Sequence, residues 1–113
     1  MGKRDEKIAQ YTAEAKKLGL KISADLIEKV TVGLGPSIYK KDSETIACSQ
    51  ASELATVKKN FLQKKLGLKE DDAKLDAAIK KVCEEMGSSN RNKYRAIFYA
   101  LLTKAFKKES VYA

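Results

Sequence analysis

The sequence contains no histidine and no tryptophan, and it has only one proline and two cysteines among its 113 residues. Histidine is the most frequent general base and metal ligand, so its absence argues against most acid–base and metal-dependent enzymes. The two cysteines, Cys48 and Cys83, lack the close spacing of a zinc site. No apolar run is long enough to cross a bilayer. We therefore expect a protein that is not an enzyme, with no metal, no cofactor and no membrane partner.

The composition is that of a folded helical protein. Hydrophobic residues make up 43% of the chain and charged residues 34%, and its length predicts a single domain, residues 1–113. No segment alternates apolar and polar residues as a half-buried strand does. The N-terminal "MGKRDEKIAQ" has no apolar core of a signal peptide, so we expect a cytoplasmic protein with reduced thiols. The predicted fold is all-α.

Apolar residues at three- and four-residue spacing predict about five main helices. They fall at about residues 4–18, 23–34, 50–66, 72–86 and 89–107. Ser23 is a suitable N-cap for the second helix, and Ser88 or Ser89 for the last one. The segment between the second and third helices, from Ser37, is expected to hold short, irregular helical pieces. The result is a compact multihelical domain.

The hexapeptide KKLGLK occurs twice, at residues 16–21 and 64–69. Each copy lies between two predicted helices, and the helix after each copy ends at a glycine before a serine-containing start. One explanation is an internal duplication that produced two related halves. The alternative is convergence, because a glycine followed by leucine is an effective helix stop and lysines complement the negative end of a helix.

The stretch from residue 88 to residue 108 carries six cations and no acid, in a chain whose net charge is +8. A helix start exposes backbone N–H groups and the positive end of the helix dipole, which favour anions. Ser89, Arg91, Lys93 and Arg95 are therefore candidate contacts for a phosphate-bearing or nucleic-acid partner. The alternative is that the serine only caps the helix and the arginines pair with acids of another helix.

Two further hypotheses concern other surfaces. A protein-interaction or homodimer interface would use an apolar face of the last helix, or the "PSIY" turn, with Ile38, Tyr39 and Tyr99 as candidate contacts. A thiol enzyme would use Cys48, since a helix N-terminus favours the thiolate. We rank the anion-binding module first, the interaction module second and the thiol enzyme last.

Four stretches resemble a known family. "GLGPSIY" (residues 33–39), "KNFLQKKLGL" (59–68), "MGSSNRNKYRAIFYALL" (86–102) and "KESVY" (108–112) are similar to a family of short bacterial proteins of unknown function with an all-helical fold. The resemblance spans nearly the whole chain. It implies a bacterial, cytoplasmic helical domain and brings no assigned catalytic or binding residue.

Overall fold

The computed structural model describes residues 3–20, 22–40, 44–46, 48, 50–87 and 93–112. Its helical elements are α1 (Lys3–Lys17), α2 (Ala24–Leu34), η1 (Gly35–Tyr39), α4 (Ala51–Thr56), η2 (Val57–Lys65), α5 (Asp72–Glu85), α6 (Arg95–Ala105) and η3 (Glu109–Tyr112). Elements η1 and η3 are 3-10 helices, and η2 is a π-helix. Within these ranges the only β-type pairing is an isolated antiparallel bridge between Thr45 and Tyr94. The predicted all-α fold is confirmed.

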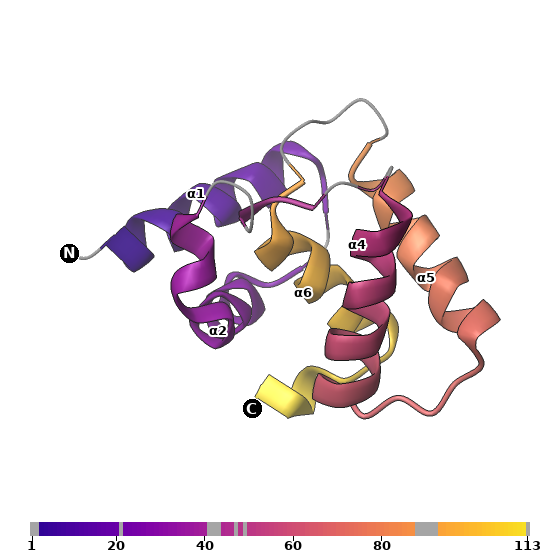
Figure 1. Ribbon diagram of the computed structural model, residues 1–113. Helices are drawn as coiled ribbons and strands as arrows, with labels where there is room; N and C mark the ends of the chain where they lie inside the picture. The colour runs from indigo at the N-terminus through magenta and orange to yellow at the C-terminus, as the bar shows by residue number, and fades with distance from the viewer. Residues whose placement is uncertain are drawn as a thin grey trace.

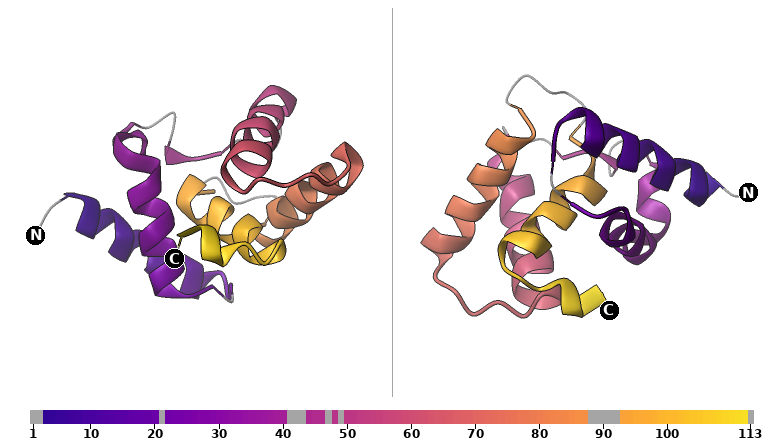
Figure 2. Two further views of the ribbon diagram at one scale, coloured as in Figure 1. Left: turned by 90° about the horizontal axis from the view of Figure 1, so that it is seen from below. Right: turned by 180° about the vertical axis from the view of Figure 1, so that it is seen from behind.

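Helix α6 occupies the centre of the molecule (Figure 1). Helices α1 and α2 lie on one side of it, and α4, η2 and α5 lie on the other, an arrangement that persists in both further views (Figure 2). The buried residues of α6 are Ala96, Ile97, Phe98, Ala100, Leu101, Leu102 and Thr103. A helix that is buried on nearly all sides forms the core of a fold rather than its surface. The two helix pairs therefore meet through α6.

The start of α2 is capped by a side chain, whereas the start of α5 carries acids without a side-chain capping bond. The N–H of Leu26 donates to the Ser23 hydroxyl at 3.1 Å, which confirms the predicted N-cap of α2. Helix α5 begins at Asp72, with Asp71 in the N-cap position. The acidic side chains there complement the positive end of the helix dipole. These boundaries are determined by neighbours in sequence.

The third predicted helix is present but changes its winding partway. It is α-helical as α4 and then continues as the π-helix η2. The N–H of Leu66 donates to the carbonyl of Phe61, five residues earlier, at 2.9 Å. Buried side chains here follow spacings of four and five residues, from Val57 to Phe61 and Leu62 and then to Leu66. A π-helix has more residues per turn than an α-helix, so it keeps these side chains on one face.

Both KKLGLK copies end a helix, but the two helix ends differ. Gly19 and Gly67 have left-handed φ angles of 71° and 66°. After the first copy, the N–H of Leu20 donates to the carbonyl of Ala15 at 3.0 Å, as in a Schellman motif. After the second copy, the N–H of Leu68 donates to a carbonyl six residues earlier, because the preceding helix is a π-helix. The repeated order of helix, turn and helix is present, and common ancestry of the halves stays a prediction.

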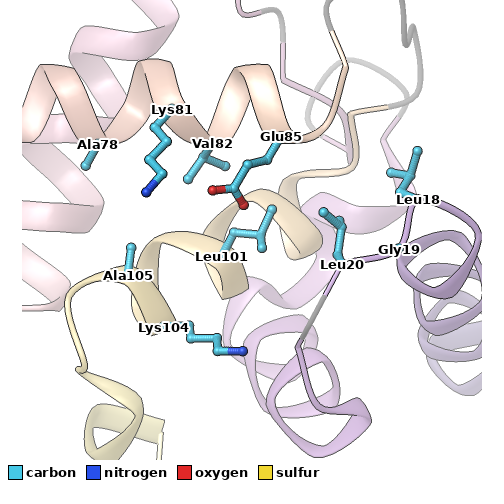
Figure 3. Close-up of a pocket in the computed structure, with 10 residues that line it drawn as sticks. All are labelled: Leu18, Gly19, Leu20, Ala78, Lys81, Val82, Glu85, Leu101, Lys104 and Ala105. Carbon is cyan, nitrogen blue, oxygen red and sulfur yellow. The ribbon is translucent and has the colours of Figure 1, made fainter.

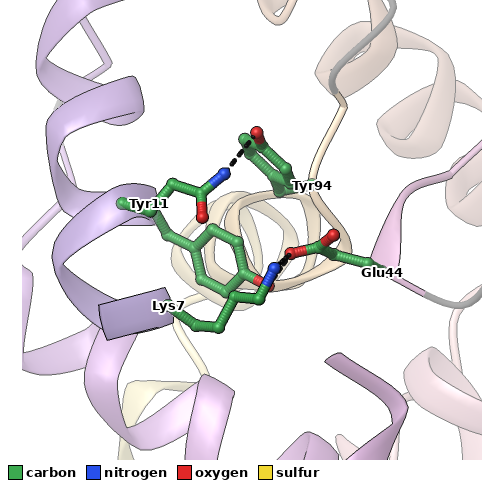
Figure 4. Close-up of polar contacts among 5 residues, drawn as sticks. Lys7, Tyr11, Glu44 and Tyr94 are labelled. Carbon is green, nitrogen blue, oxygen red and sulfur yellow. Dashed lines mark hydrogen bonds and ion pairs between the residues drawn. The ribbon is translucent and has the colours of Figure 1, made fainter. Parts of the chain in front are cut away.

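A polar cluster attaches α1 to the segment before α4 and to the start of α6 (Figure 4). The Tyr11 hydroxyl donates to Glu44 Oε2 at 2.7 Å, and Lys7 Nζ lies 2.6 Å from the same oxygen. Gln10 Nε2 donates to the Tyr94 hydroxyl at 2.7 Å. The rings of Tyr11 and Tyr94 pack with their centroids 4.9 Å apart. These contacts join three segments that are far apart in sequence.

A disulfide joins Cys48 to Cys83 across 35 positions of sequence. It links the segment before α4 to the last part of α5, and both residues pack against the core. The prediction that both thiols are reduced is therefore wrong for this structure. The bond could not be predicted from the sequence because the two cysteines are far apart in the chain. Only the fold brings their Cα atoms to within 6.1 Å of each other.

Replacement of Lys107 by glycine is expected to stabilise the protein. Lys107 has a φ of 55° and occupies the same position after α6 as Gly19 does after α1. A side chain in the left-handed region costs about 1 kcal/mol relative to glycine. Urea unfolding of Lys107→Gly should show a gain of about 0.5–1 kcal/mol. Lys108→Gly is the control and should give no gain, and an equal gain there would contradict this explanation.

Stability is expected to fall at alkaline pH through two tyrosines, the buried Tyr11 and the partly buried Tyr112. Burial, followed by the hydrogen bond to Glu44, raises the pKa of Tyr11 well above its usual 10. Burial raises the pKa of Tyr112 to about 12. The unfolded chain therefore loses these protons first as the pH rises, so the unfolding free energy is unaffected below pH 10 and decreases from there through pH 12.

Urea unfolding between pH 7 and pH 12 tests this effect. Tyr11→Phe should cost about 1–2 kcal/mol at pH 7, since Glu44 loses a donor. Both Tyr11→Phe and Tyr112→Phe should show a shallower alkaline decline than the parent chain, because phenylalanine does not ionise. Lysine titration is common to all three proteins and cancels in the comparison. Parallel pH profiles would show that these tyrosines are not the cause.

Candidate functional site

Two members of the predicted anion-binding group, Lys93 and Arg95, lie within the described residues, and these two do not form an open site. Ser89 and Arg91 lie outside the described residues. Lys93 is buried, with only 8% of its surface exposed. Arg95 is partly buried, and its side chain contacts an acid of another helix. Lys93 and Arg95 are therefore engaged in contacts within the protein.

The last helix also starts later than predicted. It begins at Arg95, and its N-cap is Tyr94 in an extended conformation, so a start at Ser88 or Ser89 is wrong. The N–H of Ile46 donates to the carbonyl of Lys93 at 2.8 Å, and Tyr94 pairs with Thr45. This pairing with a remote segment holds residues 93 and 94 extended. This tertiary contact outweighs the local preference of the serines for an N-cap position.

Arg95 forms a fork between α4 and its own helix. Its Nη2 lies 2.9 Å from Glu53 Oε1, and its Nη1 donates to the Tyr99 hydroxyl at 3.0 Å. The Tyr99 ring stacks on Phe61 at 3.9 Å between centroids. The alternative interpretation, in which this arginine pairs with an acid of another helix, is confirmed for Arg95.

The residues proposed for a protein interface are divided by the fold. Ile38 is 1% exposed and belongs to the core, so its role as a surface contact is wrong. Tyr99 is partly buried by the stack with Phe61. Tyr39 is 47% exposed and remains accessible. The apolar face of α6 is covered by the surrounding helices, so no observation favours that face as an interface.

A different site is formed between α5, α6 and the turn after α1 (Figure 3). This α5–α6 pocket has a volume of about 570 Å³ and ten lining residues. Leu20, Val82 and Leu101 are among its apolar lining residues. Leu20 reaches the pocket because the left-handed glycine of the first KKLGLK turns the chain back onto the bundle. The volume is in the range typical of small-molecule sites.

Three charged side chains line the same pocket. Lys81 and Glu85 extend from successive turns of α5 toward α6, and Lys104 extends from α6 (Figure 3). Lys81 and Glu85 share a face of α5 because they are four residues apart. All three are exposed, so the pocket combines an aliphatic interior with an excess of one positive charge at its solvent-facing side.

Sequence analysis missed this pocket because its residues come from three separate segments. Lys104 lies in the last turn of α6, where its charge also complements the negative end of the helix dipole. The sequence feature that could have indicated the pocket is a small residue on each helix. These are Ala78 on α5 and Ala105 on α6, which face one another across the pocket (Figure 3). Small side chains leave space between helices.

A family model described as "Protein of unknown function (DUF2853)" matches residues 10–110. The chain belongs to this family. The expected resemblance to an uncharacterised family is thus confirmed. No curated protein matches the chain.

The DUF2853 match includes the complete α5–α6 pocket, whose lining runs from Leu18 to Ala105. Within the described part of this DUF2853 chain, no group of three or more Cys, Asp or Glu side chains is arranged to hold a metal ion. No helix in the same ranges is long and apolar enough to cross a bilayer.

Arg95→Lys should reduce stability by about 1–2 kcal/mol, although it preserves the charge. Lysine lacks the planar fork that reaches Glu53 and Tyr99 together, and a partly buried carboxylate loses a charged donor. Thermal and urea unfolding measure this loss. The matched control is Lys104→Arg on the exposed side of α6, which should change stability by less than about 0.5 kcal/mol. An unchanged stability for Arg95→Lys would mean that the fork is dispensable.

Proposed function

We propose that this protein is a non-enzymatic binding module for an amphipathic anion, with the α5–α6 pocket as its site. The observation that carries the proposal is the presence of Lys81 and Lys104 on two helices beside a shared aliphatic interior. An anionic partner was also the first hypothesis from the sequence. The residues that would bind it are different from those predicted.

The aliphatic part of the ligand would contact Leu20, Val82 and Leu101. These three side chains come from different elements, so a ligand between them would remove apolar surface from water on several sides. Burial of apolar surface contributes roughly 25 cal/mol per Å². A short alkyl chain is the chemistry that matches this interior.

The anionic group of the ligand would lie toward the two lysines. Glu85 opposes an anion, because its carboxylate projects from the same face of α5 as Lys81 (Figure 3). The charge arrangement therefore predicts opposite effects of neutralisation. Loss of a lysine weakens binding of an anion, and loss of Glu85 strengthens it.

The lining chemistry supports this ligand class over nucleic acid and over catalysis by a hydroxyl or thiol nucleophile. None of the ten lining residues is aromatic, so the pocket offers no ring on which a base would stack. It also offers no cysteine, serine, threonine or tyrosine as a nucleophile. Its polar groups are two lysines and one glutamate, which bind and select charge.

Titration of the ¹⁵N-labelled protein with octyl phosphate below its critical micelle concentration tests the proposal. We expect shifted amide signals in α5, α6 and residues 18–20. Lys81→Gln and Lys104→Gln should each weaken binding by about fivefold, equivalent to about 1 kcal/mol, and Glu85→Gln should strengthen it. Lys59→Gln, at an exposed lysine of η2 that does not line the pocket, is the matched control and should bind as the parent does.

Three comparison ligands separate the contributions of the alkyl chain, the anionic group and the overall charge of the protein to binding. Octanol should bind weakly without charge dependence, and inorganic phosphate should not produce saturable shifts in the pocket. Labelled single-stranded DNA should bind, if at all, equally to the parent, Lys81→Gln and Lys59→Gln. Equal affinity of all variants for octyl phosphate, or a pocket-dependent affinity for DNA, would overturn the proposed ligand class.

A further inference from the structure

The Cys48–Cys83 disulfide occupies the wall of a second cavity. This cavity has a volume of about 520 Å³ and lies between α4, the start of η2 and α5. Leu54 and Ile79 line it together with both cysteines. Each cysteine is only partly buried, so the bond lies at the edge of the core rather than inside it. A small thiol can approach a sulfur atom through such a cavity.

Helix α4 has few other attachments to the protein, of which the packing of the partly buried Leu54 against the core is one. It is six residues long, and none of its residues is buried. Its Glu53 forms an ion pair with Arg95 of α6. The disulfide holds the chain three residues before α4 begins. The position of the start of α4 therefore depends strongly on this one bond.

The rest of this region has independent attachments. In η2, the buried side chains of Val57, Phe61 and Leu62 pack into the core. Lys58 Nζ lies 3.1 Å from Asp76 Oδ1, which joins η2 to α5. These contacts do not involve the cysteines. Loss of the bond is thus expected to free α4 while η2, α5 and α6 keep their places.

The surroundings of the bond also favour its cleavage. Lys80 is on α5 three residues before Cys83, and both line the cavity. Residues three apart are neighbours on a helix surface. A cation beside the departing sulfur stabilises the thiolate that forms when a disulfide is attacked.

We propose that the Cys48–Cys83 bond is a reversible thiol–disulfide exchange site for an external dithiol reductant, and that its reduction releases the start of α4. This inference does not depend on the α5–α6 pocket, which uses another face of α5.

The exchange proceeds in two steps. One thiolate of the reductant attacks Cys48 or Cys83, which forms a mixed disulfide and releases the other protein sulfur as a thiolate. The second thiol of the reductant loses its proton and attacks the mixed disulfide, which releases the second protein sulfur. The reductant leaves as a disulfide. Two electrons and two protons pass in total, so the protein gains two thiols and the reductant loses two.

Dithiothreitol is the probe, applied to the full chain without denaturant. Alkylation followed by mass spectrometry should count no modified cysteine before reduction and two after it. Hydrogen exchange should accelerate at least tenfold in residues 51–56 and change less than twofold in α6. Oxidised glutathione should then restore the bond and the original exchange pattern in the folded protein.

Two variants make the test specific. Cys48→Ser/Cys83→Ser should reproduce the exchange pattern of the reduced parent and should not respond to dithiothreitol. Glu53→Gln removes the ion-pair partner of Arg95 but keeps the bond, so its α4 should exchange more slowly than that of the reduced parent. A bond that is reduced only in denaturant, unchanged exchange in α4, or loss of protection throughout the reduced chain would each overturn the proposal.

Discussion

The burial of α6 is the constraint on which the rest of the structure depends. Helices α1 and α2 cover one side of α6, and η2 and α5 cover the other, so neither half of the chain completes a core without it. Burial also determines whether the positive charges near the start of α6 are accessible to a ligand. Lys93 is enclosed by the fold and Arg95 is held by Glu53, so charge that looked available for a ligand is used inside the protein. The proposed ligand site instead uses exposed cations away from the start of α6, Lys81 on α5 and Lys104 in the last turn of α6.

Specific polar contacts and one covalent bond position the segments that lack a strong apolar face. Glu44 accepts bonds from α1, and the backbone beside it pairs with residues 93 and 94. Helix α4 has no buried residue and is held by the Arg95 fork and the disulfide. Directional contacts are effective there because the hydrophobic effect supplies little preference for one orientation of an exposed segment. Leu54 is the residue of α4 that packs, partly buried, against the core.

Helix α5 separates two regions of different chemistry. Lys81 and Glu85 face the α5–α6 pocket, whereas Lys80 and Cys83 face the cavity beside α4. Adjacent residues on an α-helix point about 100° apart, so one helix presents charge and aliphatic surface to one side and a disulfide to the other. The proposed ligand site and the proposed exchange site are therefore physically distinct while they share one rigid element. This division separates the two proposed sites on the surface of a small protein.

The sequence alone determined the helical class, the approximate positions of the helices and the caps at Ser23 and Gly19, because these features depend on periodicity and on neighbours in the chain. It did not reveal the extended residues 93 and 94, the π-helical winding of η2 or the pairing of Cys48 with Cys83. It also placed Ile38 on the surface and Lys93 and Arg95 in an open anion site, whereas Ile38 and Lys93 are buried and Arg95 pairs with Glu53. Only the tertiary structure decided these points, since each depends on contacts between residues far apart in sequence, whose free energy outweighs the small local preferences of the chain.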